Sequence, residues 1–200
     1  MEIFRYGLDQ LKAGIALKLA RKEIKGILSP DTREKVQASS QAVANIAKGE
    51  KAVYGINTGF GPLCTNKISA ADTQILQENL LKSHAVGLGE PVPIEISKLM
   101  LVLKLQALAQ GYSGIRLQTL DRMIWMLENE MIPVVPIQGS VGASGDLAPL
   151  SHLFLPLIGL GRINFDGEIQ RTAEVFEKLG MEALSLGPKE GLALINGTQF

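Results

Sequence analysis

Two glycine-rich loops hold the residues of this sequence whose types and spacing could do chemistry. One loop runs from Tyr54 to Gly61 and the other from Gly139 to Asp146. Glycine permits positive φ angles and close backbone approach at an entropic cost, so these clusters indicate tightly shaped loops. Asp146 is a good cap for a helix that we expect after the second loop. The first N–H groups of that helix favour an anion or an electron-rich group in the loop. On composition alone, a helix-capping turn is the simpler interpretation.

The second loop does not match the common glycine-loop sites. It lacks the Gly-Lys-Ser/Thr ending of a triphosphate loop, and its glycine spacing differs from that of a dinucleotide loop. The segment Gly142-Ala-Ser-Gly145 lacks the residue between serine and glycine that a nucleophile elbow requires. His84 and His152 lie in no metal-binding motif, so we expect no metal and interpret His152 as a core residue.

Composition indicates one globular domain. The chain has 200 residues, of which 46% are hydrophobic and 20% are charged, which excludes a disordered chain. Twenty basic and twenty acidic residues give a net charge of zero, so we expect no nucleic-acid or membrane partner. The single cysteine excludes an intramolecular disulfide framework. The first residues form no apolar signal region, which predicts a cytoplasmic protein.

Helical patterns dominate the chain. A cap residue followed by proline starts one helix after Ser29, and a looser cap starts another after Ser69. The expected helices run from Pro30 to about Gly49, from Ser69 toward His84, from Ile94 to Gln110 as a buried helix, and from Leu117 to Met131 as an amphipathic one.

Extended patterns are few. Ala52–Ile56 is predicted to be a short extended piece, and the prolines in Ile132–Ile137 force that segment to be extended. Asp166-Gly167, between two short apolar segments, predicts a β-hairpin. No alternation of helix and strand indicates a parallel sheet. We therefore expect a mainly α fold with short β-hairpin elements.

Three segments resemble signatures of the aromatic amino acid ammonia-lyase family. They are Tyr54-Gly-Ile-Asn-Thr-Gly-Phe-Gly61, Gly142-Ala-Ser-Gly-Asp-Leu-Ala-Pro-Leu150 and Asn196-Gly-Thr-Gln199. Their order agrees with the family, and the resemblance covers essentially the whole chain. Ser83-His84-Ala85-Val86-Gly87 is similar to the version found in histidine ammonia-lyases. The resemblance thus implies conversion of L-histidine to trans-urocanate and ammonia.

The resemblance also implies an electrophile made from the chain itself, a methylidene-imidazolone (MIO) ring. It would form from Ala143, Ser144 and Gly145. The Gly145 nitrogen attacks the Ala143 carbonyl two residues back, and loss of water closes a five-membered ring. Loss of a second water turns the Ser144 Cβ into an exocyclic methylidene. Small residues permit this compression, and no ordinary side chain offers an electrophilic carbon.

Five further residues take roles that the resemblance implies by their positions. Tyr54 matches the catalytic base, although such a tyrosine could also be a buried aromatic in a glycine loop. His84 matches the residue that contacts the substrate imidazole, and Asn196 matches one that hydrogen-bonds near ring and substrate. Their structural alternatives are a core histidine and a helix cap. Asp146 is expected to cap the following helix and support the ring, and Gly61 to shape its loop.

Family members are much longer than this chain. We therefore expect residues 1–200 to form a single N-terminal ammonia-lyase region, cut before the rest of the fold, in which the ring does not form. The resemblance places a carboxylate-binding arginine and a second loop tyrosine downstream, and implies a homotetramer. Two alternatives are a tyrosine or phenylalanine ammonia-lyase or aminomutase, and an inactive truncated relative that binds other subunits.

Overall fold

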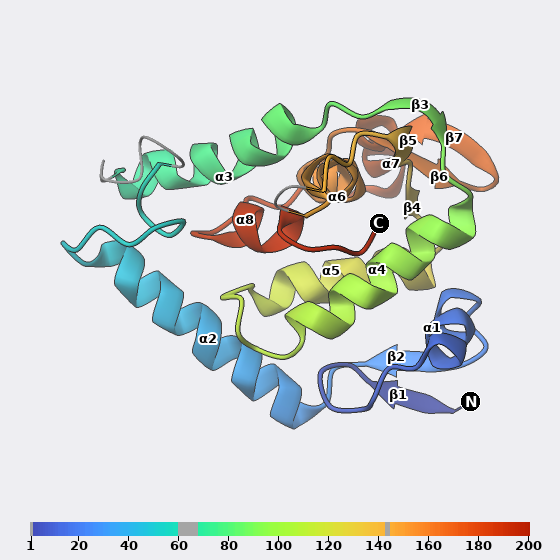
Figure 1. Cartoon of the computed structure of the whole chain (residues 1–200), viewed down its shortest axis with the longest axis horizontal. Coiled ribbons are helices and arrows are strands. Elements are labelled where there is room, and N and C mark those ends of the chain that lie inside the picture. The colour runs from blue at the N-terminus through green and yellow to red at the C-terminus, as the bar shows by residue number, and fades with distance from the viewer. Residues whose placement is uncertain (1, 60–67, 143–144) are drawn as a thin grey trace.

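The chain forms a mainly helical fold with three small sheets (Figure 1), seen in a computed structural model that describes residues 2–59, 68–142 and 145–200. The helices are α1 (Ala13–Ala20), α2 (Pro30–Lys48), α3 (Ala70–His84), α4 (Ile94–Leu108), α5 (Leu117–Glu128), α6 (Leu147–Phe154), α7 (Thr172–Leu179) and α8 (Glu190–Ile195), with a 3-10 turn η2 (Leu155–Ile158). The strands are β1 (Ile3–Arg5), β2 (Lys25–Ile27), β3 (Leu88–Pro91), β4 (Ile132–Pro133), β5 (Pro136–Gln138), β6 (Arg162–Phe165) and β7 (Glu168–Arg171). The predicted fold class is confirmed.

The two helix starts that the sequence indicated are confirmed by their caps. The Ser29 side chain accepts a hydrogen bond from the Thr32 amide at 3.2 Å, and α2 ends before Gly49. The Ser69 side chain accepts from the Asp72 amide at 3.1 Å, and α3 runs to His84. Each cap satisfies a helix N–H that has no partner within the helix.

Helices α4 and α5 form the centre of the core, as the sequence predicted. Leu101 and Leu105 of α4 and Leu120 of α5 are fully buried. Helix α5 ends at Glu128, before Met131, whose amide bonds to the Met126 carbonyl in the turn that follows. The apolar spacing therefore continued past the helix end, because the next turn also packs into the core.

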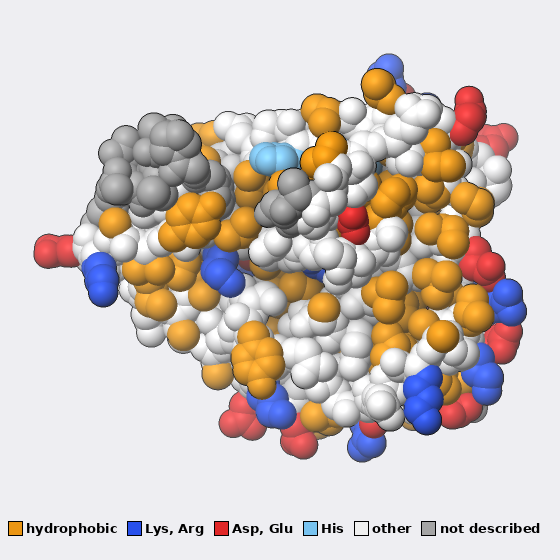
Figure 2. All heavy atoms as spheres, in the orientation of Figure 1, with side chains coloured by type: hydrophobic (Ala, Val, Ile, Leu, Met, Phe, Trp, Pro, Cys, Tyr) orange, Lys and Arg blue, Asp and Glu red, His pale blue; other side chains and the backbone are white. Residues whose placement is uncertain are grey.

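Helix α4 carries exposed apolar side chains. Ile94, Ile96 and Leu103 are each about two-fifths exposed. Figure 2 shows hydrophobic side chains gathered over α4 on this side of the molecule, with charged side chains toward the margin. The helix that the sequence predicted to be buried therefore contributes several residues to the core but leaves these apolar side chains partly uncovered. No helix of the described residues is long and apolar enough to cross a membrane.

The strand predictions are right for the proline segment and the hairpin. Pro136–Gln138 pairs with β3, and β6 pairs antiparallel with β7 and with β4. Asp166 and Gly167 have φ angles of 52° and 81°, the left-handed pair that a tight two-residue hairpin turn requires.

The expectation of no parallel pairing is wrong at the N-terminus. There β1 pairs in parallel with β2, and α1 makes the connection between them. These strands have only three residues each, too few for a visible apolar alternation. Tyr6 and Leu19 pack this unit into the core. Tertiary contacts of this kind, rather than local sequence, determine whether such short strands form.

Helix α8 lies in the middle of the fold, between α3 on one side and α4 and α5 on the other (Figure 1). A buried carboxylate, Glu190, holds its first turn. Glu190 accepts hydrogen bonds from the Arg116 amide at 3.0 Å, the Thr119 hydroxyl at 2.7 Å and the Gly187 amide at 2.7 Å. The Arg116 guanidinium adds an ion pair at 2.6 Å. These bonds fix the start of α8 to the start of α5.

We predict that Glu190→Ala lowers the free energy of unfolding by about 3–5 kcal/mol, because it leaves buried donors and the Arg116 charge unpaired. Denaturant unfolding measures this loss. The matched control is Glu95→Ala, which removes the half-exposed pair with Arg21 and should cost at most about 1 kcal/mol. Equal losses in the two variants would show that the Glu190 network does not anchor α8.

Candidate active site

A cavity of about 290 Å³ collects side chains from four separate segments of the chain. It is lined by Tyr54, Leu80, His84, Leu147, Leu192, Ile195 and Asn196. Tyr54 precedes α3 by 16 residues, and Asn196 follows α8, so only the folded chain brings them together. Three residues that the sequence nominated thus share one cavity, with the helix that follows the second glycine loop forming part of its wall.

Tyr54 reaches the cavity from a turn, not from the extended piece predicted for Ala52–Ile56. The Val53 carbonyl accepts from the Ile56 amide at 3.1 Å, and the chain reverses. Buried Asn57 holds this turn, because its side chain accepts from the Val53 amide at 2.8 Å and donates to the Lys51 carbonyl at 3.0 Å. Tyr54 itself is 58% exposed, so the alternative of a buried aromatic is wrong.

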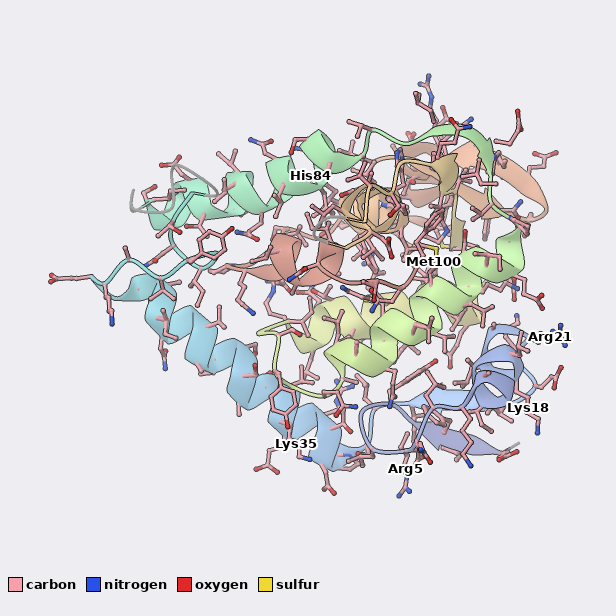
Figure 3. The ribbon with its side chains drawn as sticks, in the orientation of Figure 1. Arg5, Lys18, Arg21, Lys35, His84 and Met100 are labelled. Carbon is pink, nitrogen blue, oxygen red and sulfur yellow. The ribbon has the colours of Figure 1, made fainter. Side chains whose placement is uncertain are left out.

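His84 lies at the C-terminal end of α3, above α8 (Figure 3). Its Nδ1 is 2.9 Å from the Leu80 carbonyl oxygen. The Ser83 hydroxyl lies 3.1 Å from the same nitrogen. In the tautomer that carries its proton on Nδ1, Nδ1 donates to the Leu80 carbonyl and Nε2 is an acceptor. The half-buried ring lines the cavity and is not enclosed in the core. The structure thus places the predicted selector where a ligand could reach it.

The second glycine loop, from Gly139 to Asp146, holds the predicted electrophile and is called the electrophile loop below; the structure describes its two ends. Ala143 and Ser144 lie outside the described residues, as does Gly61. Gly142 and Gly145 flank the pair with φ angles of +66° and +100°. A Cβ on Gly145 would stand 2.4 Å from the Gly197 carbonyl oxygen, whereas one on Gly142 would meet nothing within 4 Å. Among the described residues, the loop is therefore pressed against the chain at Gly145 and has no such neighbour at Gly142.

Asp146 occupies the cap position of α6, but the predicted side-chain cap is wrong. Its carboxylate makes no bond to the first turn of α6. One oxygen instead accepts from the Ser140 hydroxyl at 2.7 Å and the other from the Phe200 amide at 3.0 Å. The Asp146 amide donates to the Gly197 carbonyl at 2.7 Å. Asp146 thus ties the electrophile loop to the segment that follows α8.

Asn196 is the residue at which α8 ends, and its amide donates to the Leu192 carbonyl at 3.0 Å. It therefore combines the helix-end role with a place on the cavity wall. Two buried polar residues that the sequence analysis did not nominate hold this region. The Gln77 side chain accepts from the Leu192 amide at 3.2 Å, and Lys104 donates to the Asn196 carbonyl at 2.7 Å. Each is a polar residue in a helix that packs into the core. A polar residue in such a helix is the one sequence signal that could have identified these two positions.

His152 lies away from this cavity, half-buried on α6. Its Nε2 accepts a hydrogen bond from the Gly87 amide at 2.9 Å. Burial, with a smaller contribution from the Arg162 charge, lowers the pKa of His152, which favours the neutral ring that this bond needs. The predicted core role therefore becomes a backbone-holding role. Within the described part of the chain, no group of three His, Cys, Asp or Glu residues could hold a metal ion.

The sequence and the fold are those of one enzyme family. Residues 11–200 match the family described as aromatic amino acid lyase, and the chain belongs to it. Among curated relatives, the histidine ammonia-lyase of Shouchella clausii is 50% identical over 96% of this chain, and that of Symbiobacterium thermophilum is 49% identical over 90%. These alignments cover 37% and 36% of the relatives' own lengths, so the chain spans little more than a third of them.

Two solved structures show the same fold at lower identity. Histidine ammonia-lyase from Trypanosoma cruzi is 34% identical, with a TM-score of 0.88 over 100% of this chain and 38% of its own. Tyrosine aminomutase from Streptomyces globisporus is 32% identical, with a TM-score of 0.89 over 100% of this chain and 37% of its own. The chain is thus a homologue of carbon–nitrogen lyases, and the two curated relatives above, at 49–50% identity, are named histidine ammonia-lyase.

We predict that Gly145→Ala destabilises the chain more than Gly142→Ala does. Both positions have positive φ, which costs a non-glycine residue about 1–2 kcal/mol. Only at Gly145 does the new methyl also overlap the Gly197 carbonyl, so the total loss should reach about 2–4 kcal/mol. Denaturant unfolding of both variants measures the difference. Similar losses would mean that Gly145 does not pack against Gly197.

Proposed function

We propose that residues 1–200 form the N-terminal ammonia-lyase region of a histidine ammonia-lyase, which converts L-histidine to trans-urocanate and ammonia. The observation that carries the proposal is the cavity in which Tyr54, His84 and Asn196 meet beside the electrophile loop. Identity of 49–50% to relatives named histidine ammonia-lyase supports the choice of substrate. The whole enzyme is proposed to be a cytoplasmic homotetramer.

Residues of the electrophile loop fit the MIO ring of the family. Gly145 has a φ of +100° and backbone packed where a side chain would stand, so this position suits a bare glycine amide. Ala143 and Ser144, just before it, supply the carbonyl and the Cβ that the ring needs. Once formed, the ring would supply an electrophilic carbon that activates the substrate amine as a leaving group.

His84 is proposed to select the substrate. With Nδ1 donating to the Leu80 carbonyl, Nε2 of the neutral ring can accept the N–H of a substrate imidazole. A phenyl ring carries no donor for this contact, so it favours histidine over phenylalanine. The phenol hydroxyl of tyrosine can also donate to Nε2, so the choice of histidine over tyrosine rests on the identity to the relatives named histidine ammonia-lyase. Asn196, across the cavity, offers amide groups that orient the substrate beside the loop.

Tyr54 is proposed to be the base that takes the β-proton of the substrate. It lines the same cavity as His84 and Asn196, so a substrate bound between them would present its β-carbon to the phenol oxygen. Its 58% exposure leaves the cavity open to water on that side. We propose that the downstream part of the whole enzyme and neighbouring subunits cover this side and supply the carboxylate-binding arginine.

An aminomutase is the second candidate, favoured by the similarity to tyrosine aminomutase at a TM-score of 0.89. Sequence identity to that structure is 32%, against 49–50% for the histidine ammonia-lyases. An inactive subunit-binding relative is the third candidate. Retention of Ala143, Ser144 and Gly145 weighs against it.

A chimera tests the activity at the length of the relatives. The chain replaces the matching N-terminal part of the Shouchella clausii enzyme. We expect L-histidine to give the ultraviolet absorbance of urocanate, and L-tyrosine and L-phenylalanine to react far more slowly. Ser144→Ala should abolish turnover, and Tyr54→Phe should lower kcat by about 10²–10⁴-fold through loss of the base. Faster turnover of tyrosine than of histidine would contradict the histidine assignment, and near-normal kcat in Tyr54→Phe would remove Tyr54 from its role.

In the 200-residue chain alone, we predict that the ring does not form. The loop is packed at Gly145 but open at Gly142, and Val141 is 86% exposed, so little compresses it from that side. Strained backbone persists only where surrounding structure determines it. Intact mass spectrometry should give the unmodified sequence mass. A mass lower by two water molecules would show that the described contacts suffice for ring closure.

A further inference from the structure

Lys104 is a lysine inside the core. It lies on α4 among Leu101, Leu105 and Leu108, and only 2% of it is exposed. Its Nζ donates a hydrogen bond to the Asn196 carbonyl oxygen at 2.7 Å. This bond crosses from α4 to the end of α8 and joins residues 92 positions apart in the chain.

The buried charge lacks a carboxylate partner among the described residues. Burial alone lowers the pKa of Lys104 to about 8, and no acidic group offsets it. The side chain is therefore mostly charged at neutral pH, at a cost in stability that an apolar residue of similar shape would not carry. Such a group at the edge of a cavity is a candidate for a functional role.

The acceptor of Lys104 belongs to the peptide that supports the electrophile loop. Asn196 lines the cavity, and the next residue, Gly197, stands against Gly145. The Gly197 carbonyl also accepts from the Asp146 amide at 2.7 Å. A fixed Asn196 carbonyl thus fixes the orientation of the Asn196–Gly197 peptide, and with it the wall behind Gly145.

We propose that Lys104 is a positioning residue of the active site, whose ammonium group clamps the Asn196–Gly197 peptide against Gly145 and Asp146. Its consequence for turnover rests on the proposed function, because this wall matters to catalysis only if Gly145 belongs to the electrophile. Lys104 acts through the backbone of Asn196 and does not touch the substrate.

The test compares Lys104→Met with Lys98→Met in the 200-residue chain. Lys98 lies on the same helix and pairs with Glu130, away from the cavity. Amide hydrogen exchange by NMR should be about tenfold or more faster at Asp146 in Lys104→Met, because the Gly197 carbonyl that accepts from this amide directly follows the Asn196–Gly197 peptide that Lys104 holds. Lys98→Met should leave that rate unchanged. Lys104→Met should still unfold cooperatively in denaturant, because relief of the buried charge offsets the unpaired Asn196 carbonyl, and this separates loss of positioning from loss of folding.

A second measurement begins with the original chain. In the original chain, the carbonyl ¹³C shift of Asn196 should change with pH in one step with the midpoint of the Lys104 side chain, near 8. The step should vanish in Lys104→Met. An Asn196 carbonyl that does not follow the titration of Lys104, or unchanged exchange at Asp146 in folded Lys104→Met, would overturn the proposal. Both readouts are independent of activity, so a chimera that fails on L-histidine contradicts the proposed function and not the Lys104 clamp.

Discussion

The close approach of the Gly197 backbone to Gly145 is the contact on which the rest of the site depends. It joins the loop before α6 to the segment after α8, two parts of the chain more than fifty residues apart, and leaves no room for a side chain. The Asp146 amide bonds to the same Gly197 carbonyl, and the Phe200 amide bonds to the Asp146 carboxylate. Displacement of α8 would therefore displace one wall of the electrophile loop.

Buried polar side chains hold α8 in place where apolar packing alone would let it slide. Glu190 fixes its first turn, Gln77 its middle and Lys104 the peptide after its last residue. Hydrogen bonds to single backbone groups specify one register, whereas apolar contacts tolerate small shifts. Proteins often accept such costs near functional sites, and the position of these three residues around one short helix agrees with that pattern.

The sequence predicted the elements that carry their own local signals. The serine caps of α2 and α3, the apolar run of α4 and the Asp-Gly hairpin were all located, because caps, period and turn chemistry are local. The prediction of an extended piece at Ala52–Ile56 was wrong, because the Asn57 side chain holds that segment in a turn. The parallel β1–β2 pair was missed because packing against the core defines it. Motif resemblance nominated Tyr54, His84 and Asn196, and the fold brings them to one cavity.

The sequence could not predict hydrogen-bond partners that lie far apart in the chain. Asp146 has the residue type and position of a cap, but its carboxylate accepts hydrogen bonds from the Ser140 hydroxyl and the Phe200 amide instead. Lys104 counts only as one charge in an apolar helix until its acceptor is known.

The most direct test of the central contact is a ¹³C-edited NOESY spectrum of the chain with labelled glycine. We predict cross-peaks between the α-protons of Gly145 and the protons of Gly197, and their absence between assigned signals would contradict the packing on which this site is built.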